Sequence, residues 1–80
     1  MEIDWRKHIH SNPNILGGKP VVRGTRISVE LILEYLAEGA PISEVLEAYD
    51  HLTEVDVRAA IAFTHDFIVK QAAAAQKEAA

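Results

Sequence analysis

The sequence contains no cysteine and no long uninterrupted apolar run. Without cysteine the chain has no disulfide framework and no thiolate ligands for a zinc site. None of its apolar stretches approaches the roughly 18 residues that a membrane-spanning helix needs, and its first residues lack the apolar run of a signal peptide. We therefore expect a cytoplasmic protein with no membrane partner.

The chain is also short, since 80 residues suffice for one small domain. A domain of about this size buries only about 60% of the surface that its unfolded chain exposes. Its core is therefore marginal without a disulfide or a metal. Self-association would compensate for this, and we expect a homodimer.

Basic residues are few, with 8 Lys and Arg against 12 Asp and Glu, which gives a net charge of -4. This balance alone disfavours a non-specific nucleic-acid binder, because phosphate neutralisation needs a cationic face. The charges are unevenly distributed, however. Residues 1–26 carry five basic and two acidic residues, whereas residues 27–80 carry three basic and ten acidic residues. An anionic partner should therefore meet the N-terminal third.

Residues 1–27 combine turn and strand residues rather than a helical pattern. Residues 11–14 read Ser-Asn-Pro-Asn, a turn signal, and the segment that follows places three glycines among β-branched residues. Residues 21–23 and 26–27 could form two short strands around Gly24. The sequence thus predicts a short N-terminal β-hairpin or an extended arm.

A first helix is predicted from the N-cap Ser28 to residue 38, where Gly39 and the following proline stop it. Its apolar and small side chains cover roughly 240° of the helix surface, more than one core contact uses. The helix should therefore be buried on two sides. Leu31 and Tyr35 lie off its principal core line, and we expect them in the homodimer interface.

Two further helices are predicted, at residues 43–49 and from residue 53 onward. The start of the last helix is marked by Thr53 and Asp56, which have the spacing of a capping box. The last two helices follow a helix-turn-helix pattern.

The predicted fold class is mainly α, a tri-helical core with a short N-terminal β segment. Its divisions are an N-terminal arm and β segment at 1–27, the core at 28–69 and an Ala-rich helical extension at 70–80. The extension has high helix propensity but almost nothing to pack against, so it should fray unless a partner covers it.

Several motifs of this chain resemble domain-of-unknown-function family 433. The most specific is the run at 18–27, Gly-Lys-Pro-Val-Val-Arg-Gly-Thr-Arg-Ile. The other matching positions are Asn12-Pro13, Val29, Gly39, Ile42-Ser43, Tyr49, Leu52-Thr53, Asp56-Val57 and Ala59-Ala60. The resemblance covers residues 3 to about 68. It implies a homeodomain-like helix-turn-helix, often encoded beside a PIN-like toxin and classed as a VapB-type antitoxin.

The sequence departs from the family pattern before the Leu-Thr pair at residues 52 and 53. The family commonly has a proline there, whereas this chain has Asp50 and His51. This difference should loosen the turn. The Ala-rich extension also belongs to this chain more than to the family pattern.

The third helix would be the reading helix of a helix-turn-helix, yet its first turn carries Glu54 and Asp56. Carboxylates repel phosphates, and a major-groove reader usually presents Arg, Lys, Asn or Gln. Helix capping and the helix dipole explain both acidic residues without a functional role. We therefore expect weak or absent major-groove reading by this helix.

The candidate binding residues are basic and lie in the N-terminal third: Arg6, Lys7, Lys19, Arg23 and Arg26. Three interpretations of Lys19, Arg23 and Arg26 remain open. The two arginines could pair with carboxylates of the acidic helices, or all three side chains could simply be solvated. Alternatively they form an arm that contacts phosphate or an acidic toxin surface, helped by Arg6 and Lys7.

Catalytic, nucleotide and metal sites are poorly supported. Gly17-Gly18-Lys19 fails as a phosphate-binding loop, because proline follows where Ser or Thr should bind magnesium. His8 and His10 could chelate a metal with Asp4, but such a pair is more often incidental. His65-Asp66 has no nucleophile in a recognisable motif. We therefore predict no enzyme activity, no cofactor and no metal.

Two functions remain in competition. The first is a dimeric antitoxin that binds a toxin, of the PIN-like kind that the resemblance implies, and possibly its own promoter DNA. The second is a non-catalytic protein-interaction module that kept a helix-turn-helix fold without binding DNA. The acidic third helix and the negative net charge favour the second, and salt-dependent binding to DNA would separate them.

Overall fold

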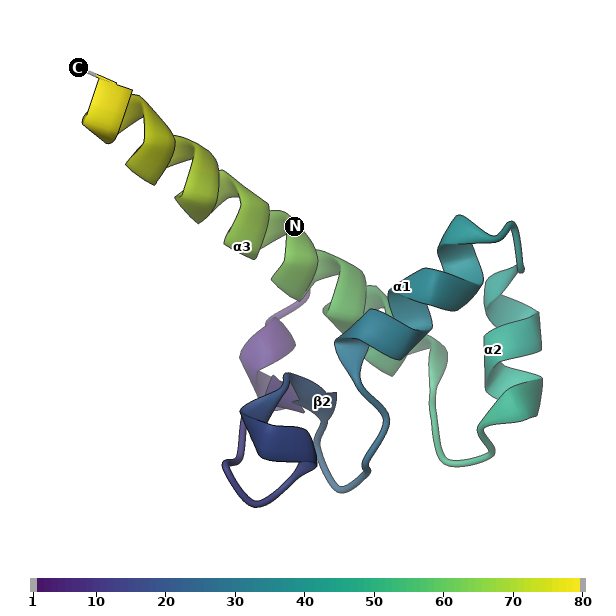
Figure 1. Ribbon diagram of the computed structural model, residues 1–80. Helices are drawn as coiled ribbons and strands as arrows, with labels where there is room; N and C mark the ends of the chain where they lie inside the picture. Colours follow the sequence, from purple (N-terminus) through teal and green to yellow (C-terminus); the bar gives the residue numbers. More distant parts are fainter. Residues whose placement is uncertain (1, 80) are drawn as a thin grey trace.

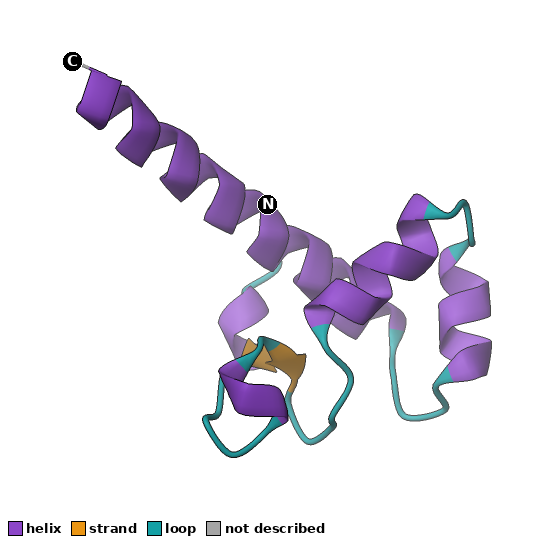
Figure 2. Ribbon diagram, viewed as in Figure 1, coloured by secondary structure: helices purple, strands orange, loops and turns teal. Residues whose placement is uncertain are grey.

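The computed structural model describes residues 2–79, which form three α-helices and a short antiparallel sheet (Figures 1 and 2). The helices are α1 (Val29–Ala37), α2 (Ile42–Ala48) and α3 (Glu54–Ala79). The sheet consists of β1 (Ile9–His10) and β2 (Val21–Val22), and the 3-10 turns are η1 (Trp5–Lys7) and η2 (Leu16–Gly18). The predicted mainly α class is thus confirmed. Met1 and Ala80, the outer ends of the predicted arm and extension, lie outside the described residues.

The sheet differs from the predicted hairpin around Gly24. β2 pairs with β1, in the register Ile9 to Val22 and His10 to Val21, and not with residues 26–27. In a regular hairpin the Ile27 amide would donate to the Val22 carbonyl. Here both groups bond to Thr25 instead, because its hydroxyl donates to the Val22 carbonyl and accepts from the Ile27 amide. The two segments around Gly24 do meet, since the Val22 amide bonds to the Ile27 carbonyl at 3.0 Å and an isolated antiparallel bridge joins Val21 to Ser28. The sequence signals thus located β2 and this contact, but not the strand β1 that pairs with β2.

The boundaries of α1 follow the prediction. The Ser28 hydroxyl accepts a hydrogen bond from the Leu31 amide at 3.0 Å, and Ser28 is itself buried. Gly39 adopts φ +94°, a left-handed conformation that ends the helix without the strain a side chain would add.

The start of α3 also follows the prediction. The Asp56 amide donates to the Thr53 hydroxyl at 3.2 Å, and the Thr53 amide donates to the Asp56 carboxylate at 3.0 Å. These reciprocal bonds are the predicted capping box. The short α2 begins one residue earlier than expected, at Ile42.

The core lies where α1, α2 and β1 meet the first half of α3. Its largest fully buried side chains come from five different segments: Ile9, Val21, Ile32, Val45 and Val57. The alanines Ala59, Ala60 and Ala62 are also buried, and their small size lets neighbouring segments approach α3 closely. The first half of α3 is therefore the central element of the fold.

The second half of α3 projects beyond this body (Figure 1). A helix of 26 residues is about 39 Å long at 1.5 Å per residue, whereas α1, which crosses it, has 9 residues. Three large apolar side chains on this part, Phe67, Ile68 and Val69, are each more than half exposed. Within residues 2–79, none of the helices is long and apolar enough to cross a membrane.

Candidate functional site

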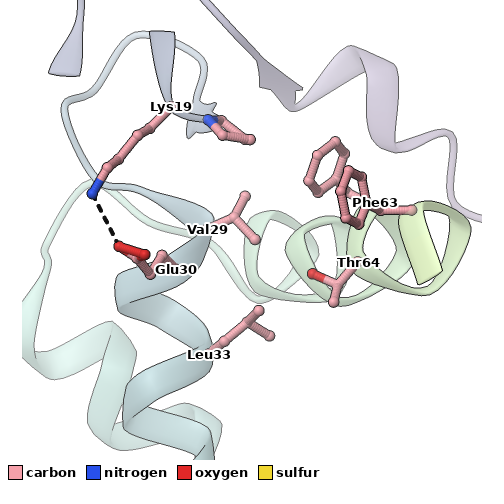
Figure 3. Close-up of a pocket in the computed structure, with 8 residues that line it drawn as sticks. Lys19, Val29, Glu30, Leu33, Phe63 and Thr64 are labelled. Carbon is pink, nitrogen blue, oxygen red and sulfur yellow. Dashed lines mark hydrogen bonds and ion pairs between the residues drawn. The ribbon is translucent and has the colours of Figure 1, made fainter. Parts of the chain in front are cut away.

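A groove between α1 and α3 is the best-formed hollow on the described surface (Figure 3). Its volume is about 410 Å³. Val29 and Leu33 of α1 face Phe63 and Thr64 of α3 across it. The complete lining is Lys19, Pro20, Val29, Glu30, Leu33, Phe63, Thr64 and Phe67.

The polar groups of this groove are confined to its edge or already bonded. Lys19 Nζ and Glu30 Oε2 form an exposed ion pair at 3.1 Å on the rim. The Thr64 hydroxyl donates to the Ala60 carbonyl at 2.8 Å, one turn back on the same helix. The groove therefore suits apolar side chains of a ligand rather than a polar substrate or a metal.

The N-terminal arm closes over α3 beside this groove. The Trp5 indole N–H donates to Asp66 Oδ2 at 2.7 Å, and the Trp5 ring meets the Phe63 ring edge-on at 4.9 Å. A second contact joins His8 Nδ1 to Asp56 Oδ1 at 2.9 Å. Because Phe63 also lines the groove, the Trp5 contact connects the arm to the wall of the groove.

Two carboxylates of α3, Asp66 and Asp56, are thus bonded to the arm. The Trp5 indole, and then the His65 ring, lower the pKa of Asp66 by hydrogen bonding to its ionised form. The Asp56 carboxylate accepts a hydrogen bond from the Thr53 amide and lies within hydrogen-bond distance of His8 Nδ1. The capping explanation of Asp56 is confirmed, whereas Glu54 is exposed on the same first turn.

The structure places the predicted basic residues in two different regions. Lys19 lies on the groove rim, paired with α1. Arg23 Nε donates to the Arg6 carbonyl at 3.1 Å, which brings Arg23 to η1 and the adjacent Lys7. The Arg6 guanidinium lies 4.5 Å from the centre of the Trp5 ring. Arg26 is exposed on the turn after β2.

The interpretation that Arg23 and Arg26 pair with carboxylates is not supported. Among residues 2–76, whose side chains the structure describes, the ion pairs within 4.0 Å involve His8, Lys19 and His65 as the cationic partners. Arg23 is instead held by the Arg6 carbonyl and lies 3.4 Å from His10 Nδ1, while Arg26 is exposed.

The expected interface residues of α1 are only half-exposed. Tyr35 packs edge-on against Tyr49, with ring centres 5.9 Å apart. Burial, and then the neighbouring Tyr35, raise the pKa of the Tyr49 hydroxyl. Leu31 is partly covered as well.

Most of the large exposed apolar side chains lie instead on α3, which was not predicted as the dimer interface. The exposed side chains there are Val55, Ile61, Phe67, Ile68 and Val69. A usable signal was present, because the predicted third helix was longer than any helix available to cover it. Comparing these lengths would have shown that its end must project.

The short sheet, the capped helices and the helix-turn-helix arrangement of α2 and α3 define a small, mainly helical class of protein. Residues 9–64 match the profile of the family described as "Protein of unknown function (DUF433)". The chain belongs to this family.

A curated relative and a solved structure support the assignment. The chain is 42% identical over 55 residues to the uncharacterized protein y4eO of Sinorhizobium fredii, covering 69% of this chain but 25% of that protein. It is also similar to a DUF433 member protein from Anabaena variabilis, at 36% identity and a TM-score of 0.70. That match covers 72% of this chain and 57% of the other. The chain thus spans a quarter of the curated relative's length.

The family match has a structural consequence, because it ends within the groove. Phe63 and Thr64 lie inside the matched range, whereas Phe67 lies beyond it. Trp5 and Asp66, which join the arm to α3, both lie outside it. Seven of the eight lining residues therefore belong to the shared unit, and Phe67 extends the groove beyond it.

Proposed function

We propose that this chain is a non-catalytic, antitoxin-like binding module of the cytoplasm, whose groove between α1 and α3 holds apolar side chains of a partner protein. The apolar groove beside Phe63 and Phe67 is the observation that supports it. A PIN-like toxin is the first candidate partner, on the strength of the family resemblance.

The energetics of the groove favour a protein ligand. Phe67 is 54% exposed at its end, and burying a side chain of that size contributes about 1.5–3 kcal/mol. Aromatic side chains in desolvated pockets commonly dominate protein–protein binding energy. A polar group of the partner that flanks the inserted side chain could bond to the Lys19–Glu30 pair on the rim, and this contact would fix the orientation of the partner.

The position of Phe67 relative to the matched family range also favours a groove that is specific for one partner. Phe67 lies outside the matched family range, so this part of the groove can differ between members that share the core. In the curated relative the matching region accounts for a quarter of the protein.

The test is binding to a PIN-like protein encoded beside this chain's gene, measured by calorimetry. Phe67→Asp should weaken the affinity by about tenfold or more, because a charge enters the apolar groove. Val55→Asp is the matched control, since Val55 is 46% exposed on the same helix but outside the groove. Equal affinities of the wild-type and Phe67→Asp proteins would contradict the proposal.

Promoter DNA is the second candidate ligand, favoured by the clustering of Arg6 and Arg23. The exposed Arg26 lies on a glycine-containing turn that can approach a phosphate backbone. The reading helix, by contrast, presents Glu54 next to its capped start. If DNA is bound, the N-terminal surface carries the phosphate contacts.

This second candidate is tested by the salt dependence of DNA affinity. Arg26→Ala should weaken binding and reduce the salt slope by about one phosphate contact per subunit. Arg58→Ala, on α3, should have a smaller effect. Thermal denaturation of both variants controls for loss of folding. Loss of binding in Arg58→Ala with unchanged binding in Arg26→Ala would restore α3 as the reading element.

A further inference from the structure

A second apolar surface runs along α3, on a different face from the groove. Its residues, alternately four and three positions apart, are Ile61, His65, Ile68, Ala72 and Ala75. All five are exposed, with Ile61 at 40% and Ile68 at 60%. We call this set the α3 seam. The alternating spacing keeps its members on one side of a helix that packs along another helix.

The surface area of the molecule indicates that something covers α3. The chain exposes 5619 Å², whereas a compact monomer of 8.8 kDa exposes about 4,800 Å². Its radius of gyration is 13.7 Å, against about 12 Å for a compact chain of this length. The excess, roughly 800 Å², equals one partner's share of a standard protein interface.

We infer that the α3 seam is the homodimer interface, in which α3 of a second copy packs antiparallel against it, centred near Lys70. This interface lies on the projecting half of α3 (Figure 1) and leaves Phe67 and the groove open. It does not depend on the proposed function of the groove.

The register follows from side-chain size. With the crossing near Lys70, two of the three large seam residues face small ones: Ile68 lies opposite Ala72 of the second copy, and His65 lies opposite Ala75. Small residues facing large ones allow close, interdigitated packing. At the end of the seam, a hollow of about 400 Å³ lined by Glu2, Ile3, Arg58 and Ile61 lies where the second helix ends.

Charge also favours α3 over the other helices as the self-contact. Between residues 57 and 76, the charged side chains are Arg58, Asp66 and Lys70, so the segment is nearly neutral. The solvent-facing residues of α1 and α2 are acidic: Glu30, Glu34, Glu38, Glu44 and Glu47. Pairing two copies through those helices would bring like charges together, which is destabilising.

The orientation is tested by cysteine cross-linking, because the chain has no cysteine of its own. A mixture of His65→Cys and Ala75→Cys proteins should form a mixed disulfide under mild oxidation, whereas neither protein should cross-link to itself. In the antiparallel pair, two copies of position 65 are separated by about 15 Å along the axis, too far for a disulfide. Self-linking of either variant would indicate a parallel pair and overturn the proposal.

The location is tested by sedimentation of the full chain at micromolar concentration. Wild type should be a dimer, and Ile68→Glu should raise the dimer dissociation constant by about a hundredfold, because two carboxylates enter the interface without partners. Ile68 is 60% exposed in the single chain, so the subunit should still fold. Val55→Glu and Phe67→Asp should both remain dimeric.

Each alternative result has a distinct meaning. A monomeric wild type overturns the inference, as does a dimer that survives Ile68→Glu but is lost in Leu31→Glu or Phe67→Asp. Loss of the dimer in Ile68→Glu, with partner binding retained, supports the inference and leaves the proposed function standing. Conversely, an intact dimer of Phe67→Asp that still binds its partner normally contradicts the function alone.

Discussion

Two carboxylates of α3, Asp56 and Asp66, show how single residues decide the character of this surface. Each accepts hydrogen bonds from residues distant in sequence, His8 and Trp5 respectively. A carboxylate that is already bonded is less available to repel or attract a ligand. The acidic composition of α3 therefore overstates the free negative charge on its packed face.

The capping box gives the first prediction. Thr53→Ala removes the hydroxyl that accepts from the Asp56 amide and should lower the free energy of unfolding by about 1 kcal/mol. Glu54→Ala should be nearly silent, because Glu54 is exposed and lies outside the capping box. Urea denaturation of both variants provides the measurement. Equal losses would mean that the hydroxyl contributes nothing specific.

Asp66 gives a prediction for pH. Its pKa is lowered in the folded chain, first by the Trp5 indole, so its contribution to stability is complete above the ordinary aspartate value of about 3.9. That contribution is lost as the pH falls through the lowered pKa. Trp5 is the single tryptophan, and its fluorescence should therefore change with a midpoint below the ordinary value.

Asp66→Asn is the control for this titration, since an amide oxygen still accepts from the indole but does not titrate. The acid transition of Trp5 fluorescence should be reduced or absent in this variant. A midpoint above the ordinary value in the wild type would contradict the assignment.

The ends of the helices could be predicted from the sequence more fully than the pairing of the strands. The ends of α1 and α3 were predictable because Ser28, Gly39, Thr53 and Asp56 act within one turn of the chain. The partner of β2 was not, because Ile9 lies 13 residues from Val22 and nothing local favours that pairing. Long-range contacts of this kind depend on burial, and Ile9 is among the fully buried side chains.

The candidate site was less predictable than the fold. The basic residues were found by composition, but the groove required the crossing of α1 over α3, which brings Leu33 near Phe63. No prediction from the sequence concerned Phe67, which is 54% exposed. The helical spacing of apolar residues predicts which face of the helix they share. Whether another element covers that face depends on the length of the helix that packs against it.

α3 itself gives a prediction at the level of an element. Ending the chain after Val69 should abolish the dimer while leaving the temperature of unfolding of the dilute monomer nearly unchanged, because this removes residues 70–80, of which 70–76 are described as exposed. Hydrogen exchange of the wild type adds a second measurement. Amides beyond Val69 should be protected at dimer-forming concentrations and exchange rapidly on dilution. Protection that is independent of concentration would contradict the interface.

At the scale of the whole molecule, the charges are segregated, with an excess of basic residues before residue 27 and of acidic residues after it. The α3 seam lies within the second of these segments, but the stretch from 57 to 76 that contains it is nearly neutral. Salt should therefore act differently on the two kinds of binding that this molecule is proposed to perform.

Raising the salt concentration from about 50 to 200 mM should weaken DNA affinity several-fold or more, whereas the dimer dissociation constant should change less than about twofold. Anisotropy and sedimentation over one salt series measure both. A dimer that dissociates steeply with salt would indicate an interface held by ion pairs rather than by the α3 seam.

The contact between Trp5 and Asp66 joins two segments that both lie outside the matched family range. We therefore expect the arm and the part of α3 around Asp66 to be gained or lost together in evolution. A family member without the arm would leave the Phe63 position open to water, and selection should replace it with a smaller or polar residue. Members that keep a tryptophan before β1 should keep an acceptor three positions after the Phe63 position.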